Sequence, residues 1–145
     1  MAFRITEDCR GCSHCVQWCP TKAISGRRKV NFSIDSARCI DCGVCGRICT
    51  FSAVMRPDGN YAERMRRSQW NHPLWDFDAC TNCDRCVSAC PVKCIQNAGR
   101  DEPEKSMKSN YPYLTRLNMC IGCGFCSAAC EAGAIRMQPM ESGTR

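Results

Sequence analysis

Apolar residues are sparse along this chain of 145 residues, too sparse for a conventional hydrophobic core. Two stretches are expected to lie outside the helices and strands. Residues 97–110 are polar and contain Pro103, which predicts a surface loop, and residues 139–145 are expected to form a flexible tail. No run of 18 apolar residues occurs, so we expect no membrane-spanning helix. The length allows one or two small domains.

A third stretch, residues 55–79, is expected to join two halves of the chain. Pro57, Asp58 and Gly59 form a turn signal, and residues 62–70 are expected to form a turn or two of helix that ends before Pro73. The stretch is basic and carries two tryptophans. It fits either a strap that covers the seam between the halves or a docking surface, since Trp and Arg are enriched at interfaces, and both readings stay open.

Cysteine is the feature that changes this picture, with 17 residues of 145. Such a content is typical of disulfide scaffolds and of metal-cluster proteins. The beginning of the chain has no apolar stretch of the secretory type. We therefore expect a cytoplasmic protein, in which closely spaced cysteines serve as metal ligands rather than as disulfides.

Sixteen of the cysteines belong to a fourfold repeat. Segments that start at Cys9, Cys39, Cys80 and Cys120 align without gaps as C-x2-C-x2-C-x3-C. Cysteines three residues apart on a tight loop can hold three corners of a 4Fe–4S cube. The fourth cysteine, expected where a helix begins, points away and serves a cube on a neighbouring motif. Zinc sites usually show two separated pairs, so zinc is the weaker reading.

The motifs resemble, twice over, those of the bacterial two-cluster ferredoxin family, across residues 5–57 and 76–138. The resemblance implies an α+β fold of two tandem dicluster modules. Each module has two short βαβ-like halves with pseudo-twofold symmetry and is stabilised by its clusters. The domains we expect are a first module at 1–58, a basic, Trp-containing linker at 59–78, a second module at 79–138 and the tail at 139–145.

The same resemblance suggests where the short elements lie. Residues 29–35 and 111–117 resemble the strands that enter motifs two and four. The four residues that end each repeat, at 21–24, 51–54, 92–95 and 132–135, resemble short helical turns after the fourth cysteine.

Carrying over the family's pairing implies four 4Fe–4S clusters, each with three cysteines of one motif and the fourth cysteine of its partner motif. The ligand sets are Cys9, Cys12, Cys15 and Cys49; Cys39, Cys42, Cys45 and Cys19; Cys80, Cys83, Cys86 and Cys130; and Cys120, Cys123, Cys126 and Cys90.

A nested pairing, motif one with four and two with three, occurs in electron-transfer subunits of many molybdenum enzymes and hydrogenases. Motif starts here are 30, 41 and 40 residues apart. The first interval suits sequential pairing, and the other two do not distinguish the schemes. We favour the sequential scheme because nested families tend to carry insertions within a motif, and this chain has none.

Two features depart from the repeat. The family's proline after the fourth cysteine is present as Pro20 and Pro91 but replaced by Thr50 and Glu131, which we expect to affect the local backbone and cluster potentials rather than ligation. Cys94, the seventeenth cysteine, stands where the other motifs have alanine. Because free cysteine packs as a small hydrophobe, we expect Cys94 to be a packing residue and not a ligand.

The formal charge of +6 changes once clusters are counted, because sixteen thiolates around four oxidised cores would bring it to about −2. The surplus of Lys and Arg is therefore read as compensation for cluster charge, and we expect no nucleic-acid partner.

The remaining residues offer no catalytic site: the chain has two histidines, no Gly-rich phosphate loop and no paired carboxylates. We therefore expect a non-catalytic subunit that transfers electrons through four clusters in a cytoplasmic oxidoreductase complex. It resembles the iron–sulfur subunits of tungsten-containing aldehyde oxidoreductases. The expected partners are a larger catalytic subunit with tungsten or molybdenum and a flavoprotein or NAD-linked subunit. Alternatives are a free-standing shuttle or a subunit of a formate dehydrogenase or hydrogenase.

Overall fold

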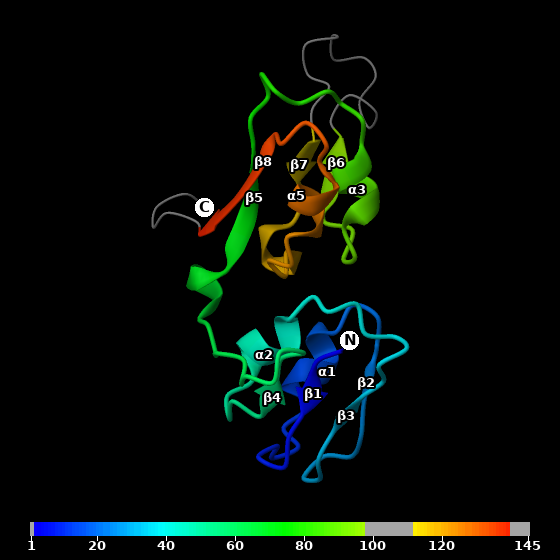
Figure 1. Ribbon diagram of the computed structural model, residues 1–145, viewed down its shortest axis with the longest axis vertical. Helices are drawn as coiled ribbons and strands as arrows, with labels where there is room; N and C mark the ends of the chain where they lie inside the picture. The colour runs from blue at the N-terminus through cyan, green and yellow to red at the C-terminus, as the bar shows by residue number, and fades with distance from the viewer. Residues whose placement is uncertain (1, 98–111, 140–145) are drawn as a thin grey trace. The chain divides into compact units, whose positions relative to one another are not determined.

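The structure is a computed structural model that describes residues 2–97 and 112–139, in two compact units, Met1–Gln69 and Trp70–Arg145 (Figure 1). Within the described residues, each α-helix of either unit is five residues long. Helices of that length are not stable alone in water, so each is held by what it packs against. None of the described helices has the length and apolar character needed to cross a bilayer.

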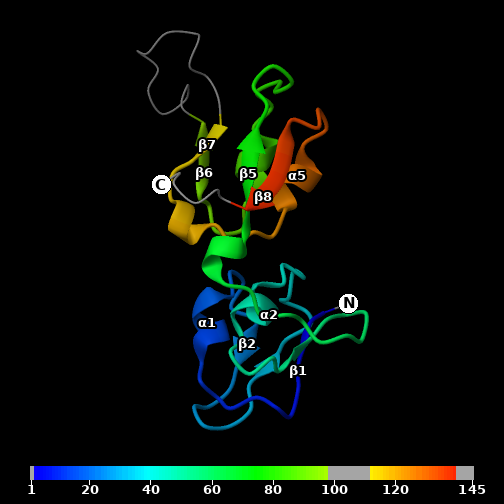
Figure 2. The same ribbon diagram turned by 90° about the vertical axis from the view of Figure 1, so that its left-hand side faces the viewer.

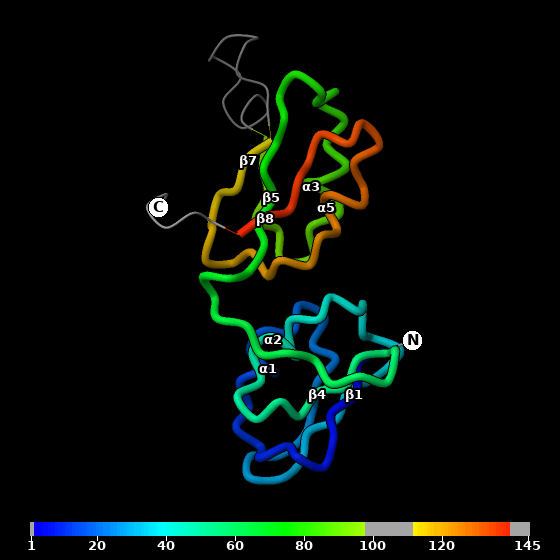
Figure 3. The backbone as a smooth tube through the Cα atoms, turned by 60° about the vertical axis from the view of Figure 1, so that its left-hand side comes forward, coloured from blue at the N-terminus to red at the C-terminus, as the bar shows by residue number. Residues whose placement is uncertain are grey.

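The first unit contains two strand–helix–strand segments in succession. The elements are β1 (Arg4–Ile5), α1 (His14–Trp18), β2 (Ile24–Ser25), β3 (Ser33–Ile34), α2 (Val44–Ile48) and β4 (Val54–Met55). The outer strands β1 and β4 pair antiparallel and lie side by side in Figure 3. The inner strands β2 and β3 also pair antiparallel (Figure 1). Helix α1 packs against α2, which brings the first two motifs together.

The second unit repeats this order. Its elements are β5 (Asn71–Trp75), α3 (Arg85–Ala89), β6 (Ile95–Asn97), β7 (Pro112–Leu114), α5 (Phe125–Ala129) and β8 (Ile135–Pro139). Strand β5 runs antiparallel beside β8, and β6 pairs with β7 (Figure 2). Helix α3 packs against α5. Two 3-10 turns complete the described elements, Arg67–Gln69 and Leu117–Met119.

The helices lie before the fourth cysteine of each motif rather than after it, so the expected helical turns are a wrong prediction. Helix α1, for example, is followed at Cys19 by extended backbone, with φ −70° and ψ 115°. Lys22 then adopts a left-handed conformation, with φ 54°, which a right-handed helix cannot continue through. The β-branched Ile24 enters a strand instead.

The stretch 55–79 also differs from expectation, since it is divided between the two units. Only Arg67–Gln69 is helical, as a 3-10 turn, and Trp70 is buried at 1% exposure. Strand β5 then pairs with β8 over five residues, including Pro73, whose expected role was to end a helix. Proline is tolerated there because a strand with one neighbour leaves its other edge unpaired.

The two expected strands are shorter than anticipated. The segment 29–35 contributes β3 only, because Lys29 is left-handed, with φ 67°. The segment 111–117 contributes β7, and position 111 lies outside the described residues. Most of the expected loop at 97–110 and of the tail at 139–145 also lies outside them.

Cysteines make up much of the interior. In the second unit the buried cluster consists of Cys86, Cys90, Cys94, Ile95, Cys120, Cys126 and Ile135. In the first unit it consists of Ile24, Phe32, Cys45, Val54 and Ala62. Thiol groups therefore occupy places that larger aliphatic side chains fill in an ordinary core.

Candidate metal centres

Each motif bends the chain with left-handed residues at the same three places. They lie two, four and thirteen residues after the first cysteine, and their φ angles run from 49° to 78°. The positions are Gly11, Ser13 and Lys22; Asp41, Gly43 and Ser52; Asn82, Asp84 and Lys93; and Gly122, Gly124 and Gly133. Positive φ is uncommon for residues other than glycine. Its recurrence at the same three places therefore indicates that all four cysteine loops need the same backbone conformation. Turns that alternate right- and left-handed residues gather N–H groups into concavities that bind anions, including the sulfurs of iron–sulfur sites.

Two of these positions need glycine for a second reason. A Cβ on Gly11 would lie 2.5 Å from the carbonyl oxygen of Val30, and one on Gly122 would lie 2.8 Å from that of Asn71. Both distances are shorter than real Cβ contacts. The loops of motifs one and four therefore press closely against the neighbouring backbone.

The first unit contains two hollows lined by cysteine. One, of about 350 Å³ and partly open to solvent, is lined by Cys9, Cys12, Cys15 and Cys49 together with apolar residues such as Phe32 and Val54. The other, of about 310 Å³, is lined by Cys19, Cys39, Cys42 and Cys45 with residues such as Ile24 and Val44. Each hollow thus combines three cysteines of one motif with the last cysteine of the other.

The electrostatic environment of the thiols shows how closely they lie in the first unit. Burial, followed by the charges of Cys49, Cys12 and Cys9 in that order, raises the pKa of Cys15 to about 11. Burial likewise, followed by the charges of Cys42 and then of Cys15 from the other motif, raises the pKa of Cys45 to about 12. Crowded thiols of this kind resist ionisation until a positive centre is bound.

In the second unit, Cys90 lies with the first three cysteines of motif four. Burial raises the pKa of Cys126 to about 12, and Cys123, Cys120 and Cys90 contribute to the increase. The remaining expected set is less closely assembled. Cys80 acts on Cys86, Cys130 packs against the buried cluster that contains Cys86, and Cys83 is exposed.

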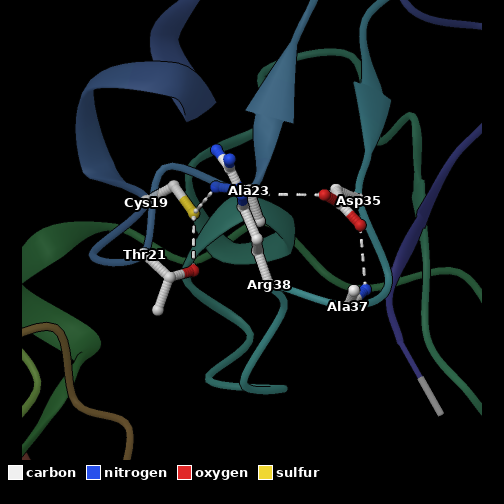
Figure 4. A network of polar contacts seen from close by, with 6 residues as sticks. All are labelled: Cys19, Thr21, Ala23, Asp35, Ala37 and Arg38. Atoms are coloured by element: carbon white, nitrogen blue, oxygen red, sulfur yellow. Dashed lines mark hydrogen bonds and ion pairs between the residues drawn. The ribbon is translucent and has the colours of Figure 1, made fainter.

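The fourth cysteine of every motif accepts a hydrogen bond from the backbone N–H four residues further on. The donor is Ala23, Ala53, Cys94 or Ala134, and the N···Sγ distances are 3.3, 3.3, 3.4 and 3.3 Å. Figure 4 shows the first of these bonds, at Cys19. At this site the Ala23 carbonyl accepts a hydrogen bond from the N–H of Asp35, which fixes the donor in place. Backbone N–H groups that donate to a ligand sulfur in this way are a common feature of iron–sulfur sites.

Two side chains on β5 lie beside these cysteines. His72 was not singled out from the sequence, and Trp75 was considered only as one of the two tryptophans of the stretch 55–79. His72 is 5% exposed, and its Nδ1 is buried without a hydrogen-bond partner among the described residues. The Nε1 of Trp75 is likewise buried and unpaired. His72 lies next to Cys120 and Trp75 next to Cys86, and each favours the thiolate of its neighbour. Local sequence patterns do not reveal that either residue lies beside a cysteine, because β5 reaches these cysteines only through long-range pairing with β8.

These features fit a 4Fe–4S cluster better than a single ion. Among the described residues no three His, Cys, Asp or Glu side chains converge as the ligands of one ion do. The thiolates of a cube bind four different irons, and the N–H donors around them match its inorganic sulfurs. The unpaired nitrogens of His72 and Trp75 are further donors of the kind that a cluster would satisfy.

Comparisons with known proteins agree with this chemistry. Three family models described as "4Fe-4S dicluster domain" match residues 8–53, 35–94 and 72–131. The first covers motifs one and two and the last covers motifs three and four, whereas the middle one overlaps both. The matches alone therefore do not select a pairing.

Individual relatives match different fractions of the chain. A "Ferredoxin 7Fe" of Hydrogenibacillus schlegelii is 40% identical over 60 residues, which are 40% of this chain and 76% of that protein. The "Pyruvate synthase subunit PorD" of Methanothermobacter marburgensis is 35% identical over 46% of this chain and 64% of its own length. The "Formate dehydrogenase iron-sulfur subunit" of Wolinella succinogenes is 31% identical over 77% of this chain and 52% of its own length.

This chain therefore spans about half to two thirds of the two oxidoreductase subunits that it matches. A solved formate dehydrogenase–heterodisulfide reductase–formylmethanofuran dehydrogenase complex from Methanospirillum hungatei contains a chain with 18% identity and a TM-score of 0.44, over 97% of this chain and 54% of that one. That similarity is too low to support an inference. The dicluster matches and the ferredoxin relative show that the chain belongs to the bacterial-type ferredoxin family, as a tandem ferredoxin with 4Fe–4S dicluster domains.

Proposed function

We propose that this chain is the electron-transfer subunit of a larger oxidoreductase complex and that it holds four 4Fe–4S clusters without a catalytic site of its own. The observation that carries the proposal is the pair of hollows in the first unit, each lined by four cysteines drawn from two motifs. A bound cluster supplies one-electron chemistry with little rearrangement. The chain supplies the thiolates, the N–H donors and the partial exclusion of water.

The ligands in this proposal are the sixteen motif cysteines in sequential pairing. The sets are Cys9, Cys12, Cys15 and Cys49; Cys39, Cys42, Cys45 and Cys19; Cys80, Cys83, Cys86 and Cys130; and Cys120, Cys123, Cys126 and Cys90. Support comes from Cys19 and Cys49, each of which lines the hollow of the other motif of its unit. A nested pairing would require Cys19 to serve motif four instead. We place one dicluster module with pseudo-twofold symmetry in each compact unit, since both units have the same order and pairing of elements.

The catalytic partner is proposed from the relatives. The formate dehydrogenase subunit matches across 77% of this chain, and the pyruvate synthase subunit across 46%. We propose a catalytic partner with molybdenum or tungsten, as in formate dehydrogenases or aldehyde oxidoreductases, and a flavoprotein or NAD-linked subunit. Such partners fit a chain that only transfers electrons. We place the complex in the cytoplasm, because reducing conditions keep free thiols available for cluster assembly.

A free-standing shuttle is the second candidate, favoured by the similarity to a single-chain ferredoxin. Native mass spectrometry of anaerobically isolated protein separates the two candidates. The subunit proposal predicts that the chain co-purifies with a larger protein at a fixed stoichiometry. A monomer that carries its clusters, with no partner at low salt, would contradict that proposal and favour the shuttle.

A further inference from the structure

Cys94 is the cysteine left over from the four proposed ligand sets. The sequence predicts packing, because the other motifs have alanine in the same place. The structure agrees that Cys94 is buried, at 2% exposure, but it also brings its thiol to other sulfurs. The Sγ of Cys94 lies 3.5 Å from the Sγ of Cys90, and Cys94 shares a buried cluster with Cys120.

The direction of this contact follows from which sulfur keeps its proton. In the proposed fourth set Cys90 and Cys120 are ligands, and a cysteine binds iron as the thiolate, which can only accept a hydrogen bond. Cys94 belongs to no ligand set and is buried, so it keeps its S–H and is the donor toward Cys90, with Cys120 in the same buried cluster.

His72 approaches the same place from another element. It lies on β5, is 5% exposed, and has a buried Nδ1 that no described group satisfies. Its imidazole lies beside Cys120. The close approach of the Asn71 carbonyl to Gly122 shows how tightly β5 is seated against the loop of motif four.

We propose that Cys94 and His72 act as a donor pair that raises the reduction potential of the cluster held by Cys120, Cys123, Cys126 and Cys90. This inference rests on the proposed function, since it assumes that cluster. Each electron taken up adds negative charge to the cluster and its thiolates. A donor aimed at a ligand sulfur stabilises the reduced form more than the oxidised form. The three sister motifs have alanine where Cys94 stands, so the S–H donor belongs to this one cluster.

The test is a redox titration of the purified full-length protein, followed by low-temperature electron paramagnetic resonance. Cys94→Ala installs the residue that the sister motifs already have, so no loss of folding is expected. We expect one cluster of four to shift to a more negative potential. The shift corresponds to an about tenfold change in its ratio of oxidised to reduced form, or ~59 mV for one electron. His72→Leu should move the same cluster in the same direction.

Cys94→Ser is the matched control, because a hydroxyl keeps a donor at this position and should retain most of the wild-type potential. The titrating cluster is assigned with Cys123→Ser, which alters a ligand of the fourth set only. Unchanged potentials in both Cys94→Ala and His72→Leu, with all iron retained, would reduce Cys94 to a packing residue and overturn the inference. Loss of about four irons in Cys94→Ala would make it a ligand and overturn it as well.

The iron content of the wild-type protein distinguishes a failure of the donor pair from a failure of the proposed function. If the wild type holds far fewer than about sixteen irons, the four-cluster proposal itself fails. If it holds the full complement and the variants do not shift, only the donor pair fails.

Discussion

At the scale of single residues, the left-handed positions determine how each cysteine loop folds around its centre. Seven of the twelve are not glycine, so most motifs accept the strain of positive φ. Glycine is needed where a side chain would also collide with backbone. Gly122 combines both conditions, since it has φ 66° and an Asn71 carbonyl oxygen 2.8 Å from the place of a Cβ.

Replacing Gly122 should therefore cost more than left-handed strain alone. We expect Gly122→Ala to lower the unfolding free energy by roughly 2–5 kcal/mol, the sum of about 1–2 for αL strain and about 1–3 for overpacking. The matched control is Gly124→Ala, because that position has φ 78° but nothing within 4 Å of a Cβ. Anaerobic thermal unfolding of the two variants provides the comparison. Equal losses would show that the approach of β5 is not a constraint.

A second prediction at this scale concerns Glu131, which replaces the proline of the family. Its carboxylate pairs with Arg85, so that it joins the beginning of α3 to the end of α5. Both side chains are largely exposed, at 54% and 75%, and exposed ion pairs contribute little. Glu131→Gln should lower the unfolding free energy by less than ~1 kcal/mol and leave the iron content unchanged. A larger loss in thermal unfolding would mean that the pair holds the two motifs together.

At the scale of elements, each helix ends at a cysteine that we assign to the neighbouring motif. Cys19 follows α1 yet lines the hollow of motif two, and Cys49 follows α2 yet lines that of motif one. The packing of α1 on α2 produces this exchange. Each unit is therefore expected to gain or lose its two clusters as a pair of interlocked sites.

Double substitutions test the exchange directly. Cys19→Ala with Cys42→Ala should disturb one cluster, because both residues are assigned to the same set. Cys19→Ala with Cys12→Ala should disturb two. The measured iron should fall by about four in the first case and about eight in the second. The reverse order would show that Cys19 binds with its own motif.

A packing contact on α2 offers an independent check on the first unit. Gly46 is buried in the helix, and a Cβ there would collide with the Cβ of Ala62. Gly46→Ala should therefore lower the unfolding free energy by about 1–3 kcal/mol despite the better helix propensity of alanine. Gly46→Ala combined with Ala62→Gly should recover most of the loss in the same unfolding experiment. A single variant more stable than the wild type would contradict the packing.

At the scale of the whole molecule, charge is distributed unevenly. The first unit has twelve Lys and Arg against six Asp and Glu, and the second has eight of each, so the surplus of +6 lies entirely in the first unit. The surplus of Lys and Arg, which the sequence analysis reads as compensation for cluster charge, would therefore compensate that charge in the first unit and not in the second. With two oxidised clusters each, the units would carry about +2 and about −4.

Both units owe much of their interior to cysteine, and this dependence is testable. Removal of iron with a strong chelator under reducing conditions should unfold the chain, because ligand binding and folding are coupled and the aliphatic core is small. Far-ultraviolet circular dichroism before and after removal measures the loss. An iron-free protein with unchanged secondary structure and a cooperative thermal transition would show that the side chains hold the fold together without clusters.

The sequence predicted the motifs and the family well, because the four cysteine spacings repeat without gaps. It placed the helices on the wrong side of the fourth cysteine, since five-residue helices are too short to show a periodic pattern. Strand β5 was not predicted, because Pro73 and the turn signals before it indicated a connecting segment. The position of His72 depends on pairing between residues more than sixty apart in the chain, which local patterns do not contain.

The most direct test of the central claim is the content of iron and acid-labile sulfide in protein purified without oxygen, together with its paramagnetism after reduction by dithionite. The account predicts about sixteen irons and sixteen sulfides per chain and a low-temperature signal from reduced 4Fe–4S clusters. A chain with far fewer irons, or with zinc in place of iron and no signal on reduction, would contradict it.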